Sequence, residues 1–229
     1  MNQEATLPSR WLAGLIGLVS VLTIAAMAHH PVAHGEDLAA RLASMARVAP
    51  LAAGVHGGLI TLLLTLLWLL GEATRQLVLL APLRRAGTLA WSIGAVLQTL
   101  AALVNGFAVP GFAAAVSDPG AATIQLLQFS WQLNQALANA GSVALLLGVG
   151  LWSIGLCGHR GMTRTLGGYG VVSAAITSLA LLAGWLKLDV HGMLLVVVLL
   201  GLWQIGLAVQ LWRASSSMSL MPIRCRIIR

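Results

Sequence analysis

Residues 51–70 read LAAGVHGGLITLLLTLLWLL, twenty consecutive residues without a charged side chain. A helix of about 20 apolar residues is long enough to cross the roughly 30 Å hydrocarbon core of a bilayer. Five more runs of this kind occur along the chain. The six predicted spans are 11–28, 51–70, 87–108, 136–157, 168–186 and 192–212. The sequence therefore predicts an all-α, polytopic transmembrane helix bundle with about six spans.

The composition leads to the same class of protein. Of the 229 residues 59% are hydrophobic and 8% are charged, whereas about a quarter of a soluble domain is charged. We expect one six-helix domain over residues 1–212 and a basic cytoplasmic tail over 213–229. The net charge of +7 does not indicate nucleic acid, because the basic residues flank apolar runs and form no stripe with aromatic residues. The expected partner is the lipid bilayer.

The distribution of basic residues predicts the orientation, because lysine and arginine concentrate in cytoplasmic loops. Three of the 13 basic residues fall on one predicted side: Arg41, Arg47 and Lys187. The other ten fall on the opposite side: Arg10, Arg75, Arg84, Arg85, Arg160, Arg164, Arg213, Arg224, Arg226 and Arg229. This asymmetry predicts an N-in/C-in protein of the inner membrane. Cys157 and Cys225 then face the cytoplasm as free thiols.

Several local patterns refine the helices. Pro50 suits the first turn of the second span, and residues 37–48 resemble a short amphipathic helix on the outer surface. Gly54 and Gly58 are spaced for close helix packing. Residues 26–28, Ala-Met-Ala, resemble a signal-peptidase site, but an uncut first helix is the preferred interpretation because the apolar run is long.

Histidines gather on the predicted outer side. His29, His30 and His34 follow the first span, His56 lies inside the second, and His191 begins the sixth. Imidazole with thioether favours copper, and imidazole alone suits zinc or haem iron. We therefore consider all five as candidate metal ligands, and His56 with His191 as candidate ligands of a cofactor such as haem. Glu36 and Asp37 are candidate acceptors for their ring N–H groups.

These histidines also have a plainer interpretation. Interfacial histidines are common, and the segment HHPVAH has no regular ligand spacing. His56 is the strongest candidate, because a polar side chain at membrane depth needs a partner. A hydrogen bond to a neighbouring helix would meet that need as well as a metal. A third interpretation is proton sensing on the outer face.

A polar stripe marks the helix expected to begin near Ala121 and to end at Cys157. Its members recur every three or four residues and so share one face. They are Gln125, Gln128, Gln132, Gln135, Asn139 and Ser142. Gln98 and Asn105 share a face of the preceding span. Amide side chains between helices often serve as membrane glue, and the alternative is a polar pocket lined by Gln98, Asn105, Gln128, Gln132, Gln135 and Asn139.

No nucleotide-binding or hydrolase motif occurs, so an enzyme is not the preferred class. The leading hypothesis is a non-enzymatic membrane protein with an outward-facing, histidine-lined pocket for a metal ion, haem or a small polar ligand. A second hypothesis is an accessory subunit, or a homo-oligomer, that docks a membrane partner on the polar stripe. A third is a haem-binding redox protein.

Overall fold

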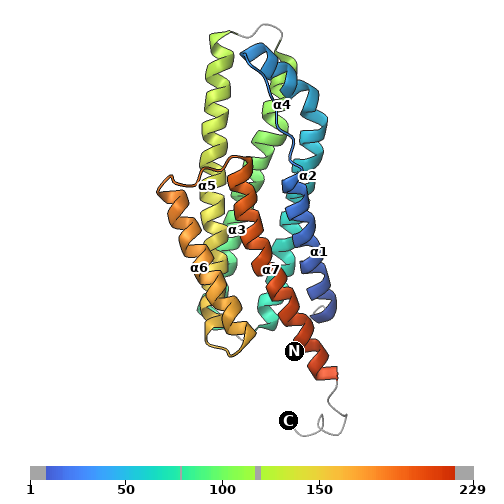
Figure 1. Ribbon diagram of the computed structural model, residues 1–229, viewed down its shortest axis with the longest axis vertical. Helices are drawn as coiled ribbons and strands as arrows, with labels where there is room; N and C mark the ends of the chain where they lie inside the picture. The colour runs from blue at the N-terminus through green and yellow to red at the C-terminus, as the bar shows by residue number, and fades with distance from the viewer. Residues whose placement is uncertain (1–8, 78, 117–119, 220–229) are drawn as a thin grey trace.

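The computed structural model describes residues 9–77, 79–116 and 120–219. Over these residues the protein is a bundle of long helices that alternate in direction (Figure 1). The elements are α1 (Ser9–Ala28), α2 (Leu38–Gln76), α3 (Ala81–Leu103), the π-helix η1 (Val104–Ala108), α4 (Val109–Ala115), α5 (Ala121–Cys157), α6 (Met162–Leu182) and α7 (Val190–Ser219). Six helical stretches, counting α3, η1 and α4 as one, are long and apolar enough to cross a membrane. The predicted all-α, multi-pass membrane protein is confirmed.

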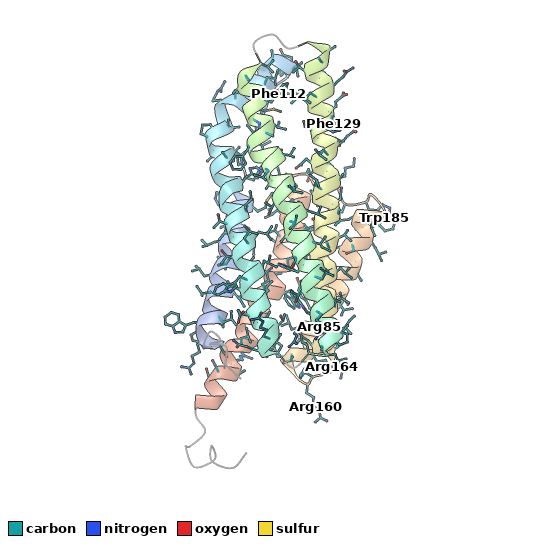
Figure 2. All side chains as sticks on the ribbon, turned by 180° about the vertical axis from the view of Figure 1, so that it is seen from behind. Arg85, Phe112, Phe129, Arg160, Arg164 and Trp185 are labelled. Carbon is teal, nitrogen blue, oxygen red and sulfur yellow. The ribbon has the colours of Figure 1, made fainter. Side chains whose placement is uncertain are left out.

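The two ends of the bundle differ in chemistry. The first residue of α1 and the last residues of α7 lie at one end, together with Arg85, Arg160 and Arg164 (Figures 1 and 2). We call this the basic end. The start of α5 lies at the opposite end, and the α1–α2 and α6–α7 connections face toward that end; we call it the histidine end. That the basic end is cytoplasmic remains a prediction from the arginine count.

Helix α2 corrects two local predictions. It begins at Leu38 and runs unbroken to Gln76, so residues 38–48 are its first turns and not a separate surface helix. Pro50 lies inside this helix and not in its first turn. The start is fixed by Asp37, whose carboxylate accepts a hydrogen bond from the Ala40 N–H at 2.7 Å, as an N-cap does. Asp37 therefore caps α2.

Several helical stretches are longer than the roughly 20 residues that a bilayer requires. Helix α5 has 37 residues, or about 55 Å at 1.5 Å per residue, and it runs from Ala121 to Cys157 as predicted. At the histidine end, α2, α4 and α5 extend beyond the ends of α1, α6 and α7 (Figure 1).

Helix α6 ends at Leu182, four residues before the predicted end of its span, and Gly184 follows with a positive φ of 71°. Asp118 and Pro119 favour a turn before α5 by sequence, and both lie outside the described residues.

Paired glycines bring α3 and α5 together. A Cβ added at Gly94 would lie 2.7 Å from the backbone nitrogen of Leu145, and one at Gly148 would lie 2.9 Å from the carbonyl oxygen of Gly87. The two pairs, Gly87 with Gly148 and Gly94 with Gly141, are seven residues apart on each antiparallel helix. Small residues let helix backbones approach closely in a membrane. The predicted pair Gly54 and Gly58 is exposed, with nothing within 4 Å of an added Cβ, so that prediction was wrong.

Three tryptophans stack through the core near the basic end. Trp91 of α3 lies 5.8 Å from Trp152 of α5, and Trp152 lies 6.0 Å from Trp203 of α7, measured between ring centroids. All three side chains are almost fully buried. The Trp152 indole N–H also donates to the Arg84 carbonyl at the start of α3. The stack therefore joins three helices that are far apart in sequence.

Candidate functional site

A cavity of about 330 Å³ lies inside the bundle between α1, α2, α3, α5 and α7. Its walls are mostly apolar, and the lining residues include Trp91, Leu66 and Leu145. The lining also includes His30, Leu188 and Asp189, which belong to the connections at the histidine end. The cavity thus extends from the tryptophan stack toward the histidine end. Its size and its apolar walls with few polar groups are typical of small-molecule sites.

His56 is the most buried histidine at this site, with 5% of its surface exposed. Its Nδ1 lies 2.8 Å from the carbonyl oxygen of Ala52, one turn earlier in α2. A carbonyl can only accept, so Nδ1 carries the proton and Nε2 of the neutral ring is an acceptor. Two groups approach that Nε2: His30 Nε2 at 3.2 Å and Asn105 Nδ2 at 3.4 Å. The sequence predicted that His56 needs a partner, and the structure supplies two, the ring of His30 and the side-chain amide of Asn105.

The π-helix η1 shapes the pocket around His56. Gly106 of η1 packs so closely on His56 that an added Cβ would overlap its Cβ and Cγ atoms and lie 2.7 Å from Nδ1. Asn105, one residue earlier, supplies the amide that reaches Nε2. Short π-helical turns within α-helices often occur at functional sites. Here the turn places an amide and a bare glycine backbone against one imidazole.

His30 meets His56 edge to face, with ring centroids 4.7 Å apart and an angle of 80° between the rings. Because His56 Nε2 is an acceptor, His30 Nε2 is the donor, and its Nδ1 is left as an acceptor. That Nδ1 is buried and has no hydrogen-bond partner among the described residues. Burial lowers the pKa of His30, and the neighbouring His56 lowers it further. The Pro31 backbone opposes these two effects more weakly, so the net shift favours the neutral ring.

Other polar side chains along the cavity are paired within the bundle. Ser20 donates to Gln204 Oε1 at 2.8 Å, joining α1 to α7. Gln98 donates to the Ser142 hydroxyl at 2.8 Å and to the Ala138 carbonyl at 3.1 Å, joining α3 to α5. The Gln98 bonds are the interhelical glue expected between the polar faces of the third and fourth spans, whereas the Ser20–Gln204 bond was not predicted. Gln135 also lines the cavity, where its amide donates to the Leu188 carbonyl at 3.0 Å.

The other candidate residues lie elsewhere. His29, His34 and His191 are exposed and are not among the residues that line the cavity. Gln125, Gln128 and Gln132 are exposed on the part of α5 near the histidine end, and Asn139 is half-buried. The structure thus brings His56 together with His30 and Asn105, and it does not place His191 in the same cavity.

The possible cofactors can be compared with this geometry. Among the described residues, no three or more His, Cys, Asp or Glu side chains gather in a way that could hold a metal ion. Two axial nitrogens on opposite sides of one iron would lie about 4 Å apart at bond lengths near 2 Å. The His30 and His56 nitrogens lie only 3.2 Å apart, so a bis-histidine haem does not fit between them.

Sequence reasoning missed several residues that line the cavity. Gln204 and Ser20 lie within apolar runs, and a polar residue inside a span was the available signal. Asn134, Asp189 and Trp91 also line it, but their positions follow from how the helices pack and no local pattern indicated them. Met27 and Met193 also line the same cavity as His30 and His56.

Comparison with known proteins gives no family for this chain. No protein-family model matches it, and neither a curated protein nor a solved structure is significantly similar to it.

Proposed function

We propose that the protein is a non-enzymatic membrane protein that binds a small amphipathic molecule in its central cavity. The observation that carries this proposal is the cavity itself, about 330 Å³ with apolar walls and with His30, His56 and Asn105 along its lining. An alkyl or ring portion would lie among the aliphatic side chains. A polar head would meet the histidines and the amide. With the basic end in the cytoplasm, the ligand would come from the outer side.

The charges along the cavity favour an uncharged head group. Among the described residues that line it there is no lysine or arginine, and the carboxylate is that of Asp189. One oxygen of Asp189 already accepts the Gly192 N–H at 2.8 Å, as the N-cap of α7. His30 Nδ1 is an acceptor without a partner, so a hydroxyl group is the head that complements it. An anionic head would be buried without a counter-charge, which is costly.

Photo-crosslinking tests this proposal. A long-chain alcohol carrying a diazirine is added to the full chain in lipid nanodiscs, and labelled peptides are mapped by mass spectrometry. We expect labelling of cavity residues such as Leu63 and Val197, competed by the unlabelled alcohol and weaker with the matching fatty acid. Labelling confined to lipid-facing residues such as Ile176 and Leu179, which are 63% and 64% exposed, would contradict the proposal.

A pair of variants separates the cavity from the lipid-facing surface. Ala102 lines the cavity, whereas Ala108 is an exposed alanine on the same helical stretch. Ala102→Trp should fill the cavity and remove the competed labelling. Ala108→Trp adds the same indole elsewhere and should leave it unchanged. Equal loss in both variants would show that the labelling does not depend on the cavity.

Partner docking is a second candidate, supported by the surface of α5. Near the histidine end Phe129 and Trp131 are 61% and 64% exposed, beside the exposed Gln125, Gln128 and Gln132. This portion extends beyond α6 and α7 (Figure 1), and Phe129 is seen at that end in Figure 2. A photoreactive residue at Gln128 should then crosslink one protein stoichiometrically in the native membrane. Lipid adducts alone would argue against docking.

A further inference from the structure

His30 and His56 have the separation of two nitrogen ligands on one tetrahedral metal ion. Their Nε2 atoms lie 3.2 Å apart. Two nitrogens bound at 2.0–2.1 Å with a tetrahedral angle between them are about 3.3–3.4 Å apart. A hydrogen-bonded imidazole pair and a metal-bound pair therefore differ here by about 0.1–0.2 Å. The exchange keeps the two nitrogens at nearly the same separation, and it requires the edge-to-face rings, whose centroids are 4.7 Å apart, to turn until both lone pairs point at one ion.

The hydrogen bond on the far side of His56 already suits a metal ligand. A histidine that binds metal through one ring nitrogen usually donates the other N–H to a carbonyl or a carboxylate, which fixes the ring and its tautomer. His56 Nδ1 donates to the Ala52 carbonyl at 2.8 Å, so its Nε2 lone pair points away from that bond. Gly106 packs against the same ring and limits its rotation. This Nε2 is thus held in the unprotonated form that a metal needs.

Two thioethers line the same cavity. Met27 precedes His30 by three residues at the end of α1, with 6% of its surface exposed, and Met193 lies in the first turn of α7. Thioether and imidazole donors together select soft Cu(I), whereas magnesium and calcium take oxygen donors. Two imidazoles and two thioethers would supply four donors, the number that a tetrahedral ion takes.

We propose that His30 Nε2 and His56 Nε2, with the sulfur atoms of Met27 and Met193, bind one Cu(I) ion in the cavity. Binding replaces the His30–His56 hydrogen bond. The proton on His30 Nε2 moves to Nδ1, so no net proton is released from the neutral pair. Copper stays Cu(I) throughout, and no electron transfer is involved. The inference goes beyond the proposed function, because it holds whether or not an organic molecule occupies the cavity.

Anaerobic titration of the purified full chain tests the site. Cu(I) is supplied as its bicinchoninate complex, and transfer to the protein is followed by loss of that complex's visible absorbance. One equivalent should transfer. His30→Ala and His56→Ala should each weaken the affinity by more than about 100-fold, because even the outer hydrogen-bond partners of metal ligands contribute 10–100-fold. His29→Ala is the matched control, since His29 is exposed and bonds the Ala25 carbonyl, and it should bind as the unaltered protein does.

Copper K-edge X-ray absorption supplies a second readout. The loaded protein should show a shell of nitrogen neighbours and a shell of sulfur neighbours, and Met27→Leu should reduce the sulfur shell while the helical circular dichroism is retained. Absence of transfer to a folded protein, equal transfer to the His30→Ala and unaltered proteins, or a site without sulfur would each overturn the proposal. Zn(II) binding without Cu(I) binding would also overturn it. Alcohol labelling is measured without metal, so the two proposals can fail separately.

Discussion

Replacing Gly106 with alanine probes how closely η1 packs against His56. An added Cβ would overlap the Cβ and Cγ of His56 and lie 2.7 Å from Nδ1, whereas non-bonded heavy atoms prefer about 3.5–4.0 Å. The ring or the helix must therefore move by roughly 1 Å. Such movement would strain the His56 bond to Ala52 and the contacts of Nε2 with His30 and Asn105.

The magnitude follows from two opposing effects. Overpacking a filled interior typically costs about 1–3 kcal/mol. Alanine in place of glycine inside a helix gains about 1 kcal/mol. Gly106→Ala should therefore lower the free energy of unfolding by about 0–2 kcal/mol. Gly111→Ala is the matched control, because nothing lies within 4 Å of its added Cβ, and it should be neutral or should gain up to about 1 kcal/mol.

Unfolding in rising mole fractions of dodecyl sulfate, followed by far-ultraviolet circular dichroism, measures the two variants side by side. We expect the free energies of unfolding of the two variants to differ by about 1–3 kcal/mol, which is the overpacking cost alone. If Gly106→Ala proves as stable as Gly111→Ala, η1 can shift to accommodate the added methyl group without a measurable cost. The described contact between Gly106 and His56 would then not constrain the ring.

Three other expectations concern the bundle as a whole. Gly94→Ala meets backbone atoms of α5 at 2.7 Å and 2.9 Å and should destabilise the protein by about 1–3 kcal/mol in the same unfolding assay. Gly54→Ala, with open space around it, should not, and equal effects would argue against glycine-mediated packing. Gln204→Ala removes the interhelical acceptor of the Ser20 hydroxyl, which also has the Ile16 carbonyl at 2.7 Å, and should cost about 0.6–2 kcal/mol. This loss should shrink in a Ser20→Ala background, and strict additivity in the double-mutant cycle would exclude coupling. A fluorescent protein fused after Ser216 should fold in the cytoplasm, while phosphatase inserted at Gly120 should be exported and active. The reverse result would invert the assigned sides.

The architecture was predictable because a bilayer restricts the options. Apolar runs of sufficient length become helices, because a single segment in lipid can pair its backbone N–H and C=O groups only within a helix. Helix ends beyond the hydrocarbon were less predictable, because Pro50 reads as a helix start and yet α2 continues through it. Local sequence does not show that the preceding residues pack against neighbouring helices.

The site was predictable only in part. His56 could be singled out by its depth alone, and Asn105 by its place on the same polar face as Gln98. Its partner His30 could not be distinguished from His29, because the turn after α1 determines which ring faces inward. His191 was a poorer choice, since the first turn of α7 leaves it exposed while Met193, two residues later, lines the cavity. Helix rotation decided each of these outcomes.

The tryptophan stack affects whether a solute can pass from the cavity to the basic end. Trp91 lines the cavity, and Trp152 and Trp203 lie behind it, almost without exposed surface. A solute travelling on to the basic end would have to part indole rings whose pairwise contacts are each worth about 0.5–1.5 kcal/mol beyond their burial. The stack therefore obstructs the direct route from the cavity to the basic end in this conformation, and we expect ligand exchange to avoid that end.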